Sequence, residues 1–168
     1  MIVDLFHWLV GLHIATGSVG LVCMWVPVIG RKGGAAHKRW GKVFAWSMLI
    51  TGCFAIGISL CTLHSPLGTH PFAADNPFYE NVGLIRGVFG WMMLYLATMT
   101  IMLAWYGLLC IRNRKQHKAN RTVLNFFLQA VTLVAALNCS WQGVVLGNPL
   151  MIAIAVVGTA AAVLNTRF

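Results

Sequence analysis

Residues 30–42 read GRKGGAAHKRWGK, and this short basic stretch separates two long apolar ones. A second basic stretch, RNRKQHKANR at residues 112–121, separates two further apolar stretches in the same way. Each holds five Lys or Arg residues, and Arg167 adds one more at the end of the chain. The remaining one, Arg86, and all three acidic residues lie in the alternate segments. Since loops that retain Lys and Arg stay on the cytoplasmic side of a membrane, this pattern predicts a multi-spanning membrane protein and its orientation.

The composition excludes a soluble globular protein. Of the 168 residues, 59% are hydrophobic and 9% are charged, and the mean hydropathy is +0.78; such values are typical of membrane proteins. The length predicts a single integral membrane domain over residues 1–168. The net charge of +9 is explained by the cytoplasmic loops and their attraction to anionic lipid headgroups. Membrane lipids, and not nucleic acids, are therefore the expected partners.

Five apolar stretches are long enough, or nearly so, to cross a bilayer, which takes about 20 residues. We expect helices because the stretches are uniformly apolar, without the period-two alternation of a membrane β-barrel. The expected fold is an all-α bundle of five transmembrane helices, with the N-terminus outside and the C-terminus in the cytoplasm. The expected spans are residues 5–29, 43–63, 87–111, 122–145 and 150–164.

Polar side chains inside a membrane are costly and are therefore functional candidates. His13 lies about eight residues into the first span, or ~12 Å along a helix. Counting depths from the outside brings Tyr95, Asn138 and Gln142 close to the same level. These four residues could form a hydrogen-bonded cluster that holds three helices together. They could equally form a ligand or proton site in the outer half of the membrane.

A second group of polar residues lies at or above the predicted outer interface: His7, His64 and His70, with Asp75 and Glu80 in the same outer loop as the last of them. Imidazoles from two helices at one depth can hold a b-type haem, and histidines beside carboxylates can bind copper or zinc. At most one haem fits this set. Its candidate ligands, which are also candidate contacts for a quinone, are His7, His13 and His64, and the candidate metal ligands are His64 and His70.

The basic stretch after the first span is rich in glycine as well as in charge. Its glycines allow a tight re-entry of the chain into the membrane, and its basic side chains can face lipid phosphates. It lacks the GxxxxGK[ST] order of a nucleotide-binding loop. We therefore expect a structured turn whose contacts with lipid headgroups come from Lys32, His37, Lys38, Arg39 and Lys42.

No catalytic constellation is recognisable in the sequence. It contains no Ser-His-Asp set, no pair of carboxylates within a span and no GxGxxG or HExxH motif. No Asp, Glu, Lys or Arg lies at a span centre, which argues against a proton pump or an ion-coupled carrier. An enzyme is therefore not the expected class.

The intramembrane His13 is followed by a Lys-Gly…His-Lys-Arg…Gly…Phe pattern that leads into the second span. In this pattern the stretch 13–59 resembles a bacterial family of uncharacterised multi-spanning membrane proteins, a domain of unknown function. Lys38 departs from it, since the family usually has Arg directly after His. The resemblance implies a bacterial inner-membrane protein and carries no activity with it. The matching residues are His13, Lys32, Gly33, His37, Arg39, Gly41, Phe44 and Met48.

These observations favour an accessory or structural subunit that packs against a larger inner-membrane complex or self-associates. The evidence is the lack of a catalytic set, the small residues within the spans and the near absence of soluble mass. One alternative is a membrane redox protein that binds one b-type haem or a quinone near the outer face. A second alternative is a permease for a small solute or a metal, built on His13, Asn138 and Gln142.

Overall fold

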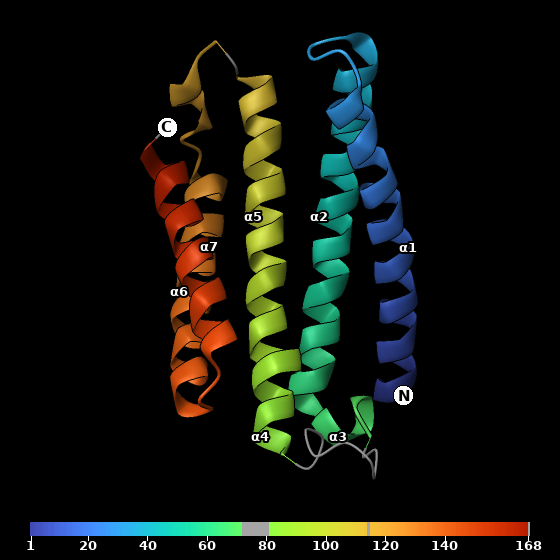
Figure 1. Ribbon diagram of the computed structural model, residues 1–168, viewed down its shortest axis with the longest axis vertical. Coiled ribbons are helices and arrows are strands. Elements are labelled where there is room, and N and C mark those ends of the chain that lie inside the picture. Colours follow the sequence, from blue (N-terminus) through green and yellow to red (C-terminus); the bar gives the residue numbers. More distant parts are fainter. Residues whose placement is uncertain (72–80, 114, 168) are drawn as a thin grey trace.

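The computed structural model describes residues 1–71, 81–113 and 115–167, and every regular element in them is a helix (Figure 1). Asp75 and Glu80, the acidic residues of the predicted outer loop near the candidate metal ligands, lie outside this described part of the chain. The elements are α1 (Ile2–Ile29), α2 (Ala35–His64), α3 (Pro66–Thr69), α4 (Val82–Ile85), the π-helical segment η2 (Arg86–Met92), α5 (Met93–Arg112), the 3-10 turn η3 (His117–Asn120), α6 (Val123–Val145) and α7 (Pro149–Arg167).

Four helices are long and apolar enough to cross a membrane, so the chain is a small multi-pass integral membrane protein. They are α1, α2, the continuous helix Val82–Arg112 and α6. The fifth helix, α7, has 19 residues. At 1.5 Å per residue it is ~28 Å long, close to the ~30 Å of a hydrocarbon core. The length of α7 is therefore compatible with a fifth span, and that span stays a prediction.

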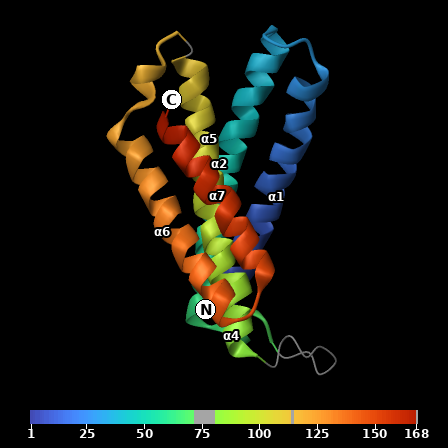
Figure 2. The same cartoon turned by 60° about the vertical axis from the view of Figure 1, so that its left-hand side comes forward.

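The helices are arranged as an α1–α2 hairpin, the central α5, and an α6–α7 hairpin (Figure 1). Both basic turns and the end of α7 lie at one end of the bundle, which we call the basic end. The N-terminus, α3 and α4 lie at the other, which we call the N-terminal end. Toward the basic end, α6 and the α1–α2 hairpin diverge (Figure 2). The two basic stretches of the sequence therefore lie together at one end of the long axis of the bundle.

The second helix begins eight residues earlier than the span expected from hydropathy, at Ala35 instead of residue 43. Gly33, with φ +79°, closes the turn, and Gly34 is the N-cap. The chain then becomes helical at once because Ala, Lys and Arg have high helix propensity whether or not they lie in lipid. The expected loop residues His37, Lys38, Arg39 and Lys42 thus lie in the first turns of α2.

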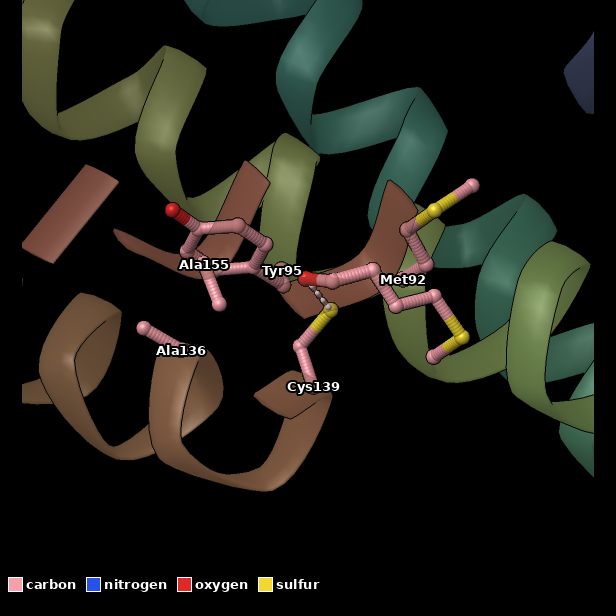
Figure 3. Packing of buried hydrophobic residues seen from close by; sticks show 6 residues of the cluster. Met92, Tyr95, Ala136, Cys139 and Ala155 are labelled. Carbon is pink, nitrogen blue, oxygen red and sulfur yellow. Dashed lines mark hydrogen bonds between the residues drawn. The ribbon is translucent and has the colours of Figure 1, made fainter. Parts of the chain in front are cut away.

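A cluster of buried apolar residues lies between α5, α6 and α7 (Figure 3). Tyr95 is fully buried there, and its hydroxyl donates a hydrogen bond to the carbonyl of Ile154 at 3.0 Å. Gly158 leaves the space that this hydroxyl occupies. On the other side, the Cys139 thiol donates to the carbonyl of Met151 at 3.6 Å. Small residues thus let α7 approach α5 and α6 closely.

Candidate functional site

A partly open cavity of about 650 Å³ lies between α1, α2 and α5. Its walls are mainly aliphatic, aromatic and methionine side chains, which is typical of pockets for apolar ligands. A small number of polar side chains project among them. These polar residues are His13 from α1, Thr51, Ser59 and Thr62 from α2, His70 after α3, and Thr100 from α5.

His13 is half-buried in the cavity wall, and its ring is oriented by a bond to the neighbouring helix. Its Nδ1 lies 3.2 Å from the carbonyl oxygen of Thr51. Because a carbonyl can only accept, Nδ1 carries the hydrogen in this bond, and neutral His13 keeps Nε2 as an acceptor. The hydroxyl of Thr51 in turn donates to that of Thr16 at 2.9 Å, which fastens α2 to α1 beside the imidazole.

His70 lines the same cavity nearer the N-terminal end. The Thr69 hydroxyl donates to the carbonyl of Ser65 at 3.0 Å, and His70 Nδ1 lies 3.1 Å from the Thr69 oxygen. The Thr69 hydroxyl has one hydrogen and several acceptors within reach, so either it or His70 Nδ1 donates in this contact. Burial lowers the pKa of His70 below its ordinary value of 6.5. This favours the neutral imidazole, which has one donor nitrogen and one acceptor nitrogen.

Two aromatic rings hold the His70 imidazole in place. Phe89 stacks on it with ring centroids 4.3 Å apart and planes 20° apart, and Phe6 meets it edge-on at 5.6 Å. Phe89 comes from the π-helical segment Arg86–Met92. π-helical turns are often found at functional sites because they change the direction of side chains within a helix. Here such a turn contains one wall residue of the cavity.

The hydroxyl groups that line the cavity can also accept hydrogen bonds from a ligand in it. Ser59 donates to the carbonyl of Ala55 at 2.8 Å, and Thr62 donates to that of Ile58 at 3.2 Å. Thr100 donates within α5 in the same way at 2.8 Å. Because each hydroxyl has one hydrogen, only oxygen lone pairs remain for a ligand. The cavity therefore suits an apolar molecule that donates hydrogen bonds.

The structure does not assemble the predicted haem ligands around one point. His7 and His64 are exposed and do not line the cavity; His7 donates to the carbonyl of Val3 at 2.7 Å. His70 packs on Phe6, seven residues before His13, which corresponds to ~10 Å along α1. Among the described residues, no three His, Cys, Asp or Glu side chains lie close enough to hold a metal ion.

The predicted cluster of His13, Tyr95, Asn138 and Gln142 is also not brought together. His13 bonds to α2, whereas Tyr95 bonds to α7, and α2 and α5 separate α1 from α6 (Figure 1). Equal depth in the membrane therefore does not make these residues neighbours. His13 and Tyr95 therefore form their hydrogen bonds with partners other than the expected ones, and a solute path through these residues stays a prediction.

Sequence reasoning missed a buried polar face on α6. Asn125 and Gln129 are each 2% exposed, and Thr132 is fully buried. Their spacing of four and three residues, which places them on one side of a helix, was the available signal. Neither amide atom of the Gln129 side chain has a hydrogen-bond partner among the described residues.

No protein family, curated protein or solved structure matches this chain.

Proposed function

We propose that the protein binds a lipid-soluble molecule bearing a hydroxyl group, of the quinol type, in the cavity between α1, α2 and α5. The observation that carries this proposal is the pairing of largely apolar walls with two imidazoles, His13 and His70. The bond from His13 Nδ1 to the Thr51 carbonyl leaves Nε2 of neutral His13 as an acceptor, to which a quinol hydroxyl can donate. The oxidised quinone has only acceptor oxygens and would meet a lone pair at this nitrogen.

The length of the cavity supports an elongated ligand. Along α1 its lining extends from Val10 to Met24, which corresponds to ~21 Å at 1.5 Å per residue. Met24, Phe44 and Met48 form its walls toward the basic end, where an isoprenoid chain would bury apolar surface. The polar head would then lie beside His13 or His70, in the half that the charge pattern places toward the outside.

The test is calorimetric titration of the purified protein in detergent with a short-chain benzoquinol and with the matching benzoquinone. The quinol should bind, and the quinone should bind about tenfold more weakly, since one lost hydrogen bond is worth about 1.4 kcal/mol.

Three variants make this test specific to the cavity. His13→Leu should weaken quinol binding by a similar factor, whereas His7→Leu, outside the cavity, should not. Ala55→Phe should reduce binding of both by filling the cavity. Equal binding of both forms, or no effect of His13→Leu and Ala55→Phe, would refute the proposal.

A second candidate is the subunit role, in which this chain packs against another membrane helix. It is favoured by Gly11 and Ala15, which lie four residues apart on the exposed side of α1. A side chain added at Gly11 would meet nothing within 4 Å. Small residues on one face let helices of different chains approach closely.

Chemical crosslinking in native membranes tests this second candidate. We expect a product heavier than the monomer, and we expect Gly11→Leu to reduce it several-fold because the side chain separates the helices. Leu12→Ile, the adjacent position with an exposed apolar side chain, is the control and should leave the product unchanged. A purely monomeric pattern would rule out this role for α1.

A further inference from the structure

A second recess, of about 530 Å³, lies at the basic end, where the first turns of α2 face the last turn of α5. Two lysines four residues apart, Lys38 and Lys42, project from the same side of α2. The opposite wall is the apolar pair Cys110 and Ile111 of α5. The recess is completed by Gly33 and His37. It therefore combines a cationic wall with an apolar one.

The cationic wall is fixed to the end of α1. His37 Nδ1 lies 3.0 Å from the carbonyl of Pro27, in the last turn of α1, and must donate to it. Gly33, with its positive φ, makes the tight turn that brings the two helices to this contact. The position of Lys38 next to His37 is thus defined by the hairpin itself.

Among the residues that the structure describes, no acidic side chain forms an ion pair with the lysines of the recess. Among the described residues, the ion pair that forms is between the N-terminal amine and Asp4 at 2.7 Å, at the opposite end of the bundle. The other two acidic residues, Asp75 and Glu80, belong to the segment between α3 and α4. Two ammonium groups beside a recess whose described lining holds no carboxylate are suited to an anion, and phosphate oxygens accept hydrogen bonds from lysine strongly.

We propose that this recess binds the phosphate group of an anionic membrane lipid. The chemistry recognised is a phosphate ester, and the lipid is favoured over a soluble phosphate because of what adjoins the lysines. Ile111 is an exposed apolar side chain in the wall opposite the lysines. A lipid chain attached to the phosphate can therefore bury apolar surface against this wall, which a free phosphate cannot do.

This site differs from the cavity proposed for the quinol-type ligand. The two have no lining residue in common, and His13 and His70 belong only to the larger one. Each proposal can therefore fail without the other.

Native mass spectrometry of the full chain in detergent, with phosphatidylglycerol, phosphatidylcholine or inorganic phosphate added, tests the recess. Phosphatidylglycerol should be retained at one molecule per chain, and phosphatidylcholine, with no net charge, should not. The double variant Lys38→Gln/Lys42→Gln should weaken retention roughly 30-fold, since each lysine near a membrane surface contributes about fivefold. The control, Lys32→Gln/Arg39→Gln, removes the same charge from exposed neighbours that do not line the recess and should change retention less than threefold.

The outcomes separate the sources of the phosphate. Inorganic phosphate that displaces the lipid at equal concentration would support a phosphate site but overturn its assignment to a lipid. Equal losses in the two double variants would overturn the site, because they would show attraction to general surface charge. The lysines are exposed, so an unchanged thermal unfolding curve of both variants is expected and checks that they fold.

Discussion

Replacing Gly158 by alanine should lower the stability of the protein markedly. The added methyl group would overlap the hydroxyl of Tyr95 and would stand 2.8 Å from the sulfur of Met99. Tyr95 is fully buried and cannot move aside without losing its hydrogen bond to Ile154. Overpacking of this kind costs about 1–3 kcal/mol. The measurement is the midpoint of thermal unfolding of the purified protein in detergent.

Two further variants make this prediction specific. Gly107→Ala, in α5, adds the same methyl group where nothing lies within 4 Å, and it should leave the midpoint unchanged or raise it slightly. Tyr95→Phe introduced with Gly158→Ala removes the overlapping hydroxyl and should recover part of the loss. If Gly158→Ala unfolds at the same temperature as the parent protein, α7 does not pack against Tyr95 as described.

Much of the fold could be predicted from the sequence because charge and hydropathy act over whole segments. The spans expected at residues 5–29 and 122–145 differ from α1 and α6 by three residues or fewer at each end. The start of α2 was missed because hydropathy marks the part of a helix that lies in lipid, whereas the helix itself continues through Ala35 to Lys42. Helix propensity, not apolarity, governs that segment.

The site was less predictable because depth in the membrane does not specify which helices are neighbours. His13 was recognised as a functional candidate, but its partner is the backbone of Thr51 and not the side chain of Asn138. The environment of His70 depends on the short helix α3 and on the π-helical turn that carries Phe89. Neither feature produces a periodic pattern in the sequence, so the shared cavity of the two histidines emerges only in three dimensions.

Replacing Gln129 by methionine should stabilise the protein. Gln129 is 2% exposed on α6, and both its Nε2 and its Oε1 lack hydrogen-bond partners among the described residues. An unsatisfied buried amide costs about 1–3 kcal/mol, and in lipid no water is at hand to relieve it. Methionine has a similar length, is apolar and adapts to irregular gaps. We therefore expect the free energy of unfolding to rise by about 1–3 kcal/mol, measured by denaturation in mixed detergent.

Gln142→Met provides the matched control on the same helix. Gln142 is half-buried, and neither of its amide atoms is both buried and unsatisfied. The same substitution there should therefore change the free energy of unfolding by less than about 0.5 kcal/mol.

A loss of stability in Gln129→Met would mean that its amide has partners in the membrane, such as ordered water between α5, α6 and α7. Trp105 Nε1 of α5 is likewise buried without a partner among the described residues. The same measurement on Trp105→Phe then shows whether water also satisfies this indole, since a loss of stability is expected only if it does.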